Sequence, residues 1–295
     1  MMRTVCILVL LLLPGGRFAF SAAQAGAANR DPFVGSTQLI IVTTSNWGAV
    51  TGQLQRFERV DRRWRPFGEP IPIVVGRNGM GWGIGLVAAD DPNVRLSSDP
   101  VKKEGDGKSP AGIFDLGSAF GYSAQPLPGL KFPYLTLTES IECVDDVNSK
   151  YYNRIVDRSA VAPDWNSSEH MRDVGESYRW GIVVDLNGTI ARRNQDVPEP
   201  GGGSCVFLHI WHDQSQGTAG CTAMTQTNLE TLLTWLDPKR RPLLLQLPMP
   251  AYERLTHRWN LPKLSNAPAR IAPARIAPVR IAPVRNAPVP NSPEH

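Results

Sequence analysis

Short apolar runs, each bounded by glycine or proline, make up most of the central part of this chain. They are rich in β-branched and aromatic residues or roughly alternate between apolar and polar: 37–44 (TQLIIVTT), 49–60 (AVTGQLQRFERV), 71–76 (IPIVVG) and 205–211 (CVFLHIW). Runs of this length and composition predict strands, because a helix needs a longer segment with a period near 3.6 residues. A further run, 179–189 (RWGIVVDLNGT), predicts a strand that ends in a turn at Asn187-Gly188. We therefore expect a fold built mainly on sheets.

Helical periodicity is clearest in residues 225–236 (TQTNLETLLTWL). Four leucines at positions 229, 232, 233 and 236 fall on one face, Thr225 or Thr227 is suited to the N-cap, and Pro238 ends the pattern. With 42% hydrophobic and 20% charged residues, the composition is typical of a globular domain. We expect a mainly β fold with a few short helices (α+β), in a single domain over residues 37–262.

Both ends of the chain differ from this domain. Arg3, the apolar residues 4–13 and Ala23-Gln24-Ala25 have the order of a secretory signal peptide, which we place at residues 1–25. A flexible lead is expected over 26–36. Residues 263–295 repeat A-P-x-R-I, and regular proline predicts an extended, disordered tail. Its four arginines leave open a second interpretation, a cationic strap for an anionic envelope polymer. We expect a secreted or periplasmic protein without a transmembrane segment after signal cleavage.

The charge distribution argues against nucleic acid as a partner. Of the formal net charge of +4, Arg3 and Arg17 contribute +2 and residues 267–295 contribute +3, which leaves −1 for residues 26–266. A nucleic-acid-binding domain needs a clustered basic face. The basic pI of 9.0 therefore reflects the two ends of the chain.

The cysteine count leaves an odd thiol. Cys6 lies in the presumed signal peptide, so the exported chain keeps Cys143, Cys205 and Cys221. We expect Cys143 to pair with Cys205, which would leave Cys221 free. A disulfide that includes Cys221 is the alternative.

Residues 209–224 (HIWHDQSQGTAGCTAM) hold the candidate chemistry. His209 lies in an apolar strand-like run, whereas Cys221 follows the small residues 217–220 and precedes the predicted helix. A thiol nucleophile needs a base, and a glycine turn lets amide N–H groups point at one oxyanion. A metal site formed by His209, His212, Asp213 and Cys221 is a competing interpretation. It is weakened because residues i and i+3 of a strand point to opposite faces, and we expect His212 in a solvated turn.

Three segments together resemble the L,D-transpeptidase catalytic domain (YkuD-like) family of bacterial cell-wall enzymes. They are 105–122 (GDGKSPAGIFDLGSAFGY), 208–211 (LHIW) and 218–224 (TAGCTAM), and the resemblance covers about residues 37–250. It implies a β-rich fold with the cysteine in a groove. It also implies attack on a peptide bond of the peptidoglycan stem.

The resemblance assigns roles by position. Cys221 aligns with the nucleophile and His209 with the general base. Gly220 and Cys221 would supply the oxyanion N–H groups, and Thr218 aligns with the family's Ser/Thr. The resemblance places a further set along the substrate groove: Gly107, Lys108, Pro110, Gly112 and Phe114. We add His212 as a residue flanking the site and Trp211 as a residue of the substrate groove.

Two alanines depart from the family pattern. Ala219 stands where the family usually has a second histidine, and Ala223 stands where it usually has arginine. The loss of that arginine removes a charge-assisted contact to a substrate carboxylate or carbonyl. The expected reaction class therefore depends less on these positions than the expected substrate does.

These observations predict an exported cysteine acyltransferase without a cofactor, with peptidoglycan stem peptides as donor and acceptor. A hydrolase with the same Cys/His site, an L,D-carboxypeptidase or amidase, is the first alternative. A non-catalytic wall-binding module is the second, with the tail and Trp47, Trp82 and Trp211 as its contacts.

Overall fold

The structure is a computed structural model, and it describes residues 31–87, 91–188 and 197–265. The expected signal peptide (1–25) and the repeat tail from residue 266 onward lie outside the described residues. Strands predominate over helices in the described chain, so the expected mainly β fold with few helices is confirmed. No helix among the described residues has the length and apolar character needed to cross a membrane.

The largest sheet runs through most of the described chain. Its main path contains β1 (Gln38–Thr44), β14 (Leu243–Pro248), β6 (Ser109–Gly121), β11 (Trp180–Val184), β12 (Phe207–Ile210), β13 (Thr222–Met224), β4 (Ile71–Val74), β2 (Thr51–Val60) and β3 (Arg63–Pro66), in this spatial order. The short strands β5 (Met80–Trp82) and β7 (Tyr134–Thr136) pair with β6. Because β1 pairs with both β14 and β2, the path closes on itself.

A small separate sheet contains β8 (Ile141–Val144), β9 (Ile155–Asp157) and β10 (Ser168–His170). A disulfide joins Cys143 of β8 to Cys205, which lies two residues before β12. This is the pair expected from the sequence, and Cys221 is a free, buried thiol. The disulfide therefore ties the small sheet to the strand that carries His209.

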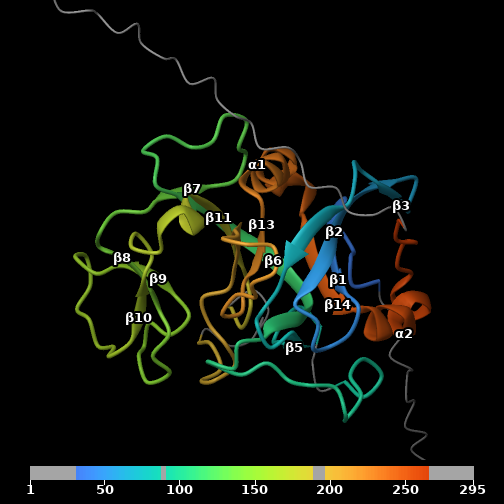
Figure 1. The fold of residues 1–295 in the computed structure, drawn as a ribbon, viewed down its shortest axis with the longest axis horizontal. Coiled ribbons are helices and arrows are strands. Elements are labelled where there is room, and N and C mark those ends of the chain that lie inside the picture. Colours follow the sequence, from blue (N-terminus) through green and yellow to red (C-terminus); the bar gives the residue numbers. More distant parts are fainter. Residues whose placement is uncertain (1–30, 88–90, 189–196, 266–295) are drawn as a thin grey trace, which may run out of the picture. The chain divides into compact units, whose positions relative to one another are not determined.

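Two α-helices pack against the large sheet (Figure 1). Helix α1 (Gln226–Trp235) begins after Thr225, whose side chain accepts a hydrogen bond from the Asn228 amide, as the sequence predicts. Helix α2 (Met249–Trp259) contacts β1 and β14, and Asn260 ends it in the left-handed conformation. Two 3₁₀ turns complete the set, η1 (Gly175–Tyr178) and η2 (Pro238–Arg240).

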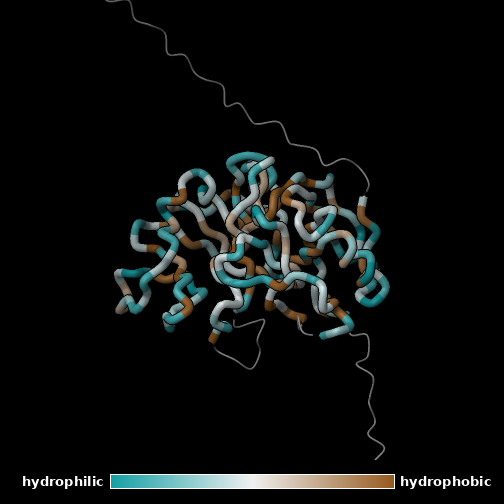
Figure 2. The backbone as a smooth tube through the Cα atoms, turned by 60° about the horizontal axis from the view of Figure 1, so that its bottom comes forward, coloured by the Kyte–Doolittle hydropathy of each residue, from teal (hydrophilic) through white to brown (hydrophobic). Residues whose placement is uncertain are grey.

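The core lies between the closed sheet and these helices. Strand β1 is buried along its whole length, which accounts for its unbroken apolar run. The leucine face of α1 packs into the same cluster: Leu229, Leu232, Leu233 and Leu236 are fully buried. In Figure 2 the peripheral loops are largely hydrophilic.

The boundaries expected for the domain are too narrow at both ends. Within the lead, Phe33 is fully buried in the core and Asp31 pairs with Arg59, so the expectation of a flexible lead is wrong for residues 31–36. At the other end, Leu264 packs against the core and Ser265 exchanges hydrogen bonds with Gln55. The packed domain therefore includes residues 263–265, which we had assigned to the tail.

Candidate active site

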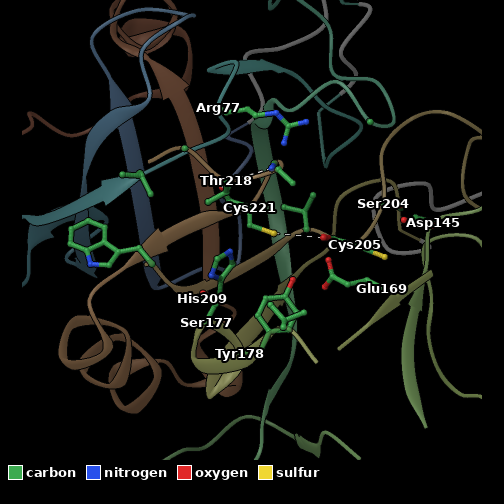
Figure 3. Close-up of a pocket in the computed structure, with 18 of the residues that line it drawn as sticks. Arg77, Asp145, Glu169, Ser177, Tyr178, Ser204, Cys205, His209, Thr218 and Cys221 are labelled. Carbon is green, nitrogen blue, oxygen red and sulfur yellow. Dashed lines mark hydrogen bonds between the residues drawn. The ribbon is translucent and has the colours of Figure 1, made fainter. Parts of the chain in front are cut away.

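A cavity of about 390 Å³ opens beside the start of β13. It brings together six of the candidate site residues selected from the sequence: His209, Trp211, His212, Thr218, Gly220 and Cys221. Figure 3 shows Cys221 and His209 facing the same space. The cavity also receives residues from β10, η1 and the loop after β4, which are far apart in the sequence.

Strand pairing explains why the cysteine and the histidine meet. Strands β12 and β13 are parallel neighbours, with His209 opposite Ala223. Cys221 is two residues before Ala223 and therefore shares the face on which His209 projects. The Phe207 amide donates a hydrogen bond to the Cys221 sulfur at 3.3 Å, which fixes the thiol next to β12.

The imidazole of His209 is held in one orientation. Its Nδ1 lies 2.8 Å from the carbonyl oxygen of Ile210, so Nδ1 carries the proton and donates it. The Tyr178 ring packs edge-on against the imidazole, with ring centroids 5.4 Å apart. Nε2 is then the nitrogen available to accept a proton.

Burial keeps both reactive groups neutral. It raises the pKa of the Cys221 thiol to about 12, and the nearby Glu169 carboxylate acts in the same direction. It lowers the pKa of the His209 imidazole to about 4. The pair is therefore a thiol and an imidazole near neutral pH, with no thiolate–imidazolium ion pair.

Hydroxyl groups support the turn that carries Cys221. The Thr218 hydroxyl donates to the Cys221 carbonyl at 2.6 Å, and the Ser109 hydroxyl lies 2.7 Å from the Gly220 carbonyl and 2.9 Å from that of Cys221. The Gly220 amide donates to Thr218 at 3.1 Å. Of the two amides expected to bind an oxyanion, the one at Gly220 thus already has an acceptor, whereas the Cys221 amide has none in the described chain.

The five residues expected to line the groove from the 105–122 element do not line the cavity in the described structure: Gly107, Lys108, Pro110, Gly112 and Phe114. Phe114 is fully buried in the core, and the Pro110 carbonyl accepts from Gln246. The backbone of Gly107 and Lys108 lies behind the turn, because added Cβ atoms on Gly76 and Gly220 would contact it. The element supports the site from behind, through Ser109.

The structure bears on both competing interpretations of the sequence, the wall-binding tryptophans and the metal site. Trp82 is buried, with its indole N–H donating to Asp99, so it offers no free aromatic platform, and the half-buried Trp47 packs against it. His212 is exposed and its Nε2 lies 3.0 Å from the Ser177 hydroxyl. Among the described residues, no three His, Cys, Asp or Glu side chains are grouped so that they could hold a metal ion.

Sequence reasoning missed several residues of the cavity wall. Tyr178 and Glu169 come from 145–178, a region without a motif, and Lys102 precedes the 105–122 element. Lys102 is buried and its ammonium lies 2.7 Å from Asp106, while its charge favours the Cys221 thiolate. No local pattern marks these residues, because only the folded chain brings them to Cys221.

The neutral pair predicts a distinctive pH profile. Activity that depends on His209 as a proton acceptor should fall as the pH drops through about 4, where the imidazole becomes protonated. No second change is expected between pH 5 and 9, because the Cys221 thiol stays protonated below about 12. The pH dependence of kcat/KM for the Cys221-dependent reaction measures this. A rising limb near pH 7 to 8 would instead indicate a reactive thiolate.

Comparisons with known proteins are sparse. No protein-family model and no curated protein matches the chain. Among solved structures, the helical cell shape determining protein Pgp2 from Campylobacter jejuni is similar, with a TM-score of 0.34 and 16% identity over 72% of this chain and 48% of that one. A variant of the same protein has a TM-score of 0.34 and 13% identity, over 72% and 47% of the two chains. The chain spans about half the length of these structures, and a likeness this weak supports no conclusion about activity.

Proposed function

We propose that this chain is a cysteine-dependent acyltransferase, with Cys221 as the nucleophile and His209 as the general base. One observation carries this proposal. His209 of β12 and Cys221, the residue before β13, line one cavity, and the His209 tautomer leaves Nε2 free to accept a proton. A free thiol and a neutral imidazole that line one cavity are the two groups that nucleophilic acyl transfer uses.

Within this class, we propose an L,D-transpeptidase of the YkuD-like kind, with that family's fold, acting on peptidoglycan stem peptides. The resemblance of 105–122, 208–211 and 218–224 to that family supports the assignment. The first and third segments meet in space, since Ser109 bonds to the carbonyls of Gly220 and Cys221, which follow it by 111 and 112 residues. Segments that meet around one thiol are better support than matches scattered over the fold.

The proposed reaction begins at the Cys221 thiol. The sulfur attacks the carbonyl carbon of the stem peptide while its proton moves to His209 Nε2. The Cys221 amide is placed to donate to the resulting oxyanion. The C–N bond then breaks, His209 returns the proton to the leaving amine, and a thioester remains on Cys221.

A second amine completes the proposed cycle. It attacks the thioester carbon, its proton passes to His209 and then to sulfur, and the free thiol is regenerated. An amine from a neighbouring stem gives a cross-link, whereas water in its place gives hydrolysis. Neither step needs a cofactor.

The proposal includes export to the cell envelope. The Cys143–Cys205 disulfide supports it, because disulfides persist mainly in oxidising compartments. The expected signal peptide and the arginine-rich tail, with its suggested anionic polymer partner, lie outside the described residues and stay predictions.

Incubation of the purified protein with disaccharide tetrapeptides tests the function. We expect cross-linked dimers by mass spectrometry, together with a covalent adduct on Cys221 after treatment with a carbapenem. If tripeptide monomers are the only product, the protein is a hydrolase and not a transferase. If neither a product nor an adduct forms, the proposed enzyme class is wrong, and the non-catalytic wall-binding module is the remaining interpretation.

A further inference from the structure

Arg77 is a cation of the cavity wall that the proposed mechanism does not use. It follows β4, and the structure gives its guanidinium no hydrogen bond or ion pair with any described residue. Lys102, also on the wall, bonds to Asp106 and to the Lys103 carbonyl. Arg77 thus offers its donors to whatever enters the cavity.

The fold holds the Arg77 backbone firmly against the turn that carries the nucleophile. Its amide donates to the Thr218 carbonyl at 2.8 Å, and the Thr218 amide donates to Val75 at 3.0 Å. This close approach requires a glycine at position 217, since an added Cβ there would lie 2.4 Å from the Arg77 Cα. The position of Arg77 is therefore tied to that of Cys221.

A second glycine makes room for the Arg77 side chain. Gly107 has a φ of +68°, and an added Cβ on it would lie 3.2 Å from both Cγ and Nε of Arg77. The side chain thus passes along Gly107, and Arg77 is both exposed and part of the cavity lining. Gly217 therefore leaves room for the Arg77 backbone, and Gly107 leaves room for its side chain.

Negative charge lies on the other side of the thiol. Figure 3 shows Glu169 on the far side of Cys221 from Arg77, and Asp145 also lines the cavity. One carboxylate oxygen of each is buried and has no hydrogen-bond partner among the described residues. A ligand carboxylate would be attracted toward Arg77 and repelled from this side, so the charge pattern sets its direction.

The arginine that the family resemblance leads one to expect is absent. Position 223 carries a fully buried alanine opposite His209, which offers a ligand no charge. Arginine binds a carboxylate with two parallel N–H···O bonds, which fix orientation as well as affinity. Arg77 lines the same cavity as the thiol, from the segment that follows β4.

We propose that Arg77 is the specificity-determining residue of this cavity, and that it binds the free carboxylate of the residue that leaves when Cys221 is acylated. The proposal rests on the acyl transfer proposed above. Within the substrate class already proposed, it assigns recognition of the C-terminal carboxylate to one side chain.

Paired substrates test this assignment. A stem tetrapeptide with a free C-terminal carboxylate is compared with its C-terminal carboxamide, using the parent protein, Arg77→Gln and Arg77→Lys. We expect kcat/KM for the carboxylate peptide to fall roughly 10- to 100-fold in Arg77→Gln, as expected for the loss of a charged hydrogen bond. Activity on the carboxamide should hardly change, and Arg77→Lys should restore part of the difference.

Arg65→Gln is the matched control. Arg65 is an exposed residue of β3, does not line the cavity, and loses the same charge on substitution. It should leave both peptides unaffected. An equal loss on both peptides in Arg77→Gln, or no loss on either, would overturn the assignment.

A binding measurement separates this inference from the reaction itself. In a Cys221→Ser background no acyl transfer is needed, and calorimetry gives the Kd of each peptide. We expect the carboxylate peptide to bind more tightly, and Arg77→Gln to remove the preference even if the parent protein turns over neither peptide. Equal binding of the two peptides, or no binding of either, would overturn the role of Arg77.

Discussion

Cys221→Ser is expected to abolish acyl transfer, with a loss of roughly 10³-fold or more, while the protein stays folded. The serine oxygen can still accept the hydrogen bond that the Phe207 amide donates to sulfur. The hydroxyl is a much weaker nucleophile than the thiol. Product formation from disaccharide tetrapeptides, measured beside the thermal unfolding midpoint, separates chemistry from stability.

The two histidines of the segment provide a matched comparison. His209→Gln should lower kcat by roughly 10²- to 10⁴-fold, the usual contribution of a general base. His212→Gln should have little effect, because His212 is exposed and bonds to Ser177 outside the strand. The same loss in both variants would contradict the choice of His209. Full activity of Cys221→Ser would contradict the whole mechanism.

Removal of the Cys143–Cys205 disulfide is expected to have the largest effect on stability. The bond joins residues 62 positions apart, and the chain-entropy model assigns such a loop about 4 kcal/mol. For a domain of this size the unfolding midpoint should drop by roughly 8 to 16 °C. Calorimetry of a Cys143→Ala/Cys205→Ala variant measures this.

The disulfide variant should also lose activity, because the Cys205 carbonyl accepts a hydrogen bond from the Cys221 sulfur at 3.7 Å. A reductant added to Cys221→Ser, which retains the disulfide, should lower its midpoint to that of the double variant. The double variant itself should not respond to reductant. If reductant does not change the unfolding midpoint of Cys221→Ser, the stabilisation assigned to the Cys143–Cys205 disulfide is wrong.

Local patterns predicted five of the fourteen strands and one of the two α-helices in the described chain. The apolar runs became β1, β2, β4, β11 and β12, and Thr225 caps α1. Strand β14 and helix α2 were not predicted. Helix α2 follows directly after β14 with Pro250 in its first turn, so proline and the short strand obscured its periodic pattern. The 105–122 element was expected to line the groove, yet its strand β6 is paired on both sides inside the sheet.

Sequence alone identified the two candidate reactive residues and predicted the disulfide pair that the structure contains. An odd cysteine count and a histidine in a strand-like run are local facts, and they led to Cys221, His209 and the Cys143–Cys205 bond. The tertiary structure, through the closed sheet, determines which other residues surround them. The cavity that contains the thiol is also lined by Arg77, Glu169 and Tyr178. They come from separate strands and turns, and packing between distant segments places them there. Such contacts depend on strand order and register, which no local propensity encodes.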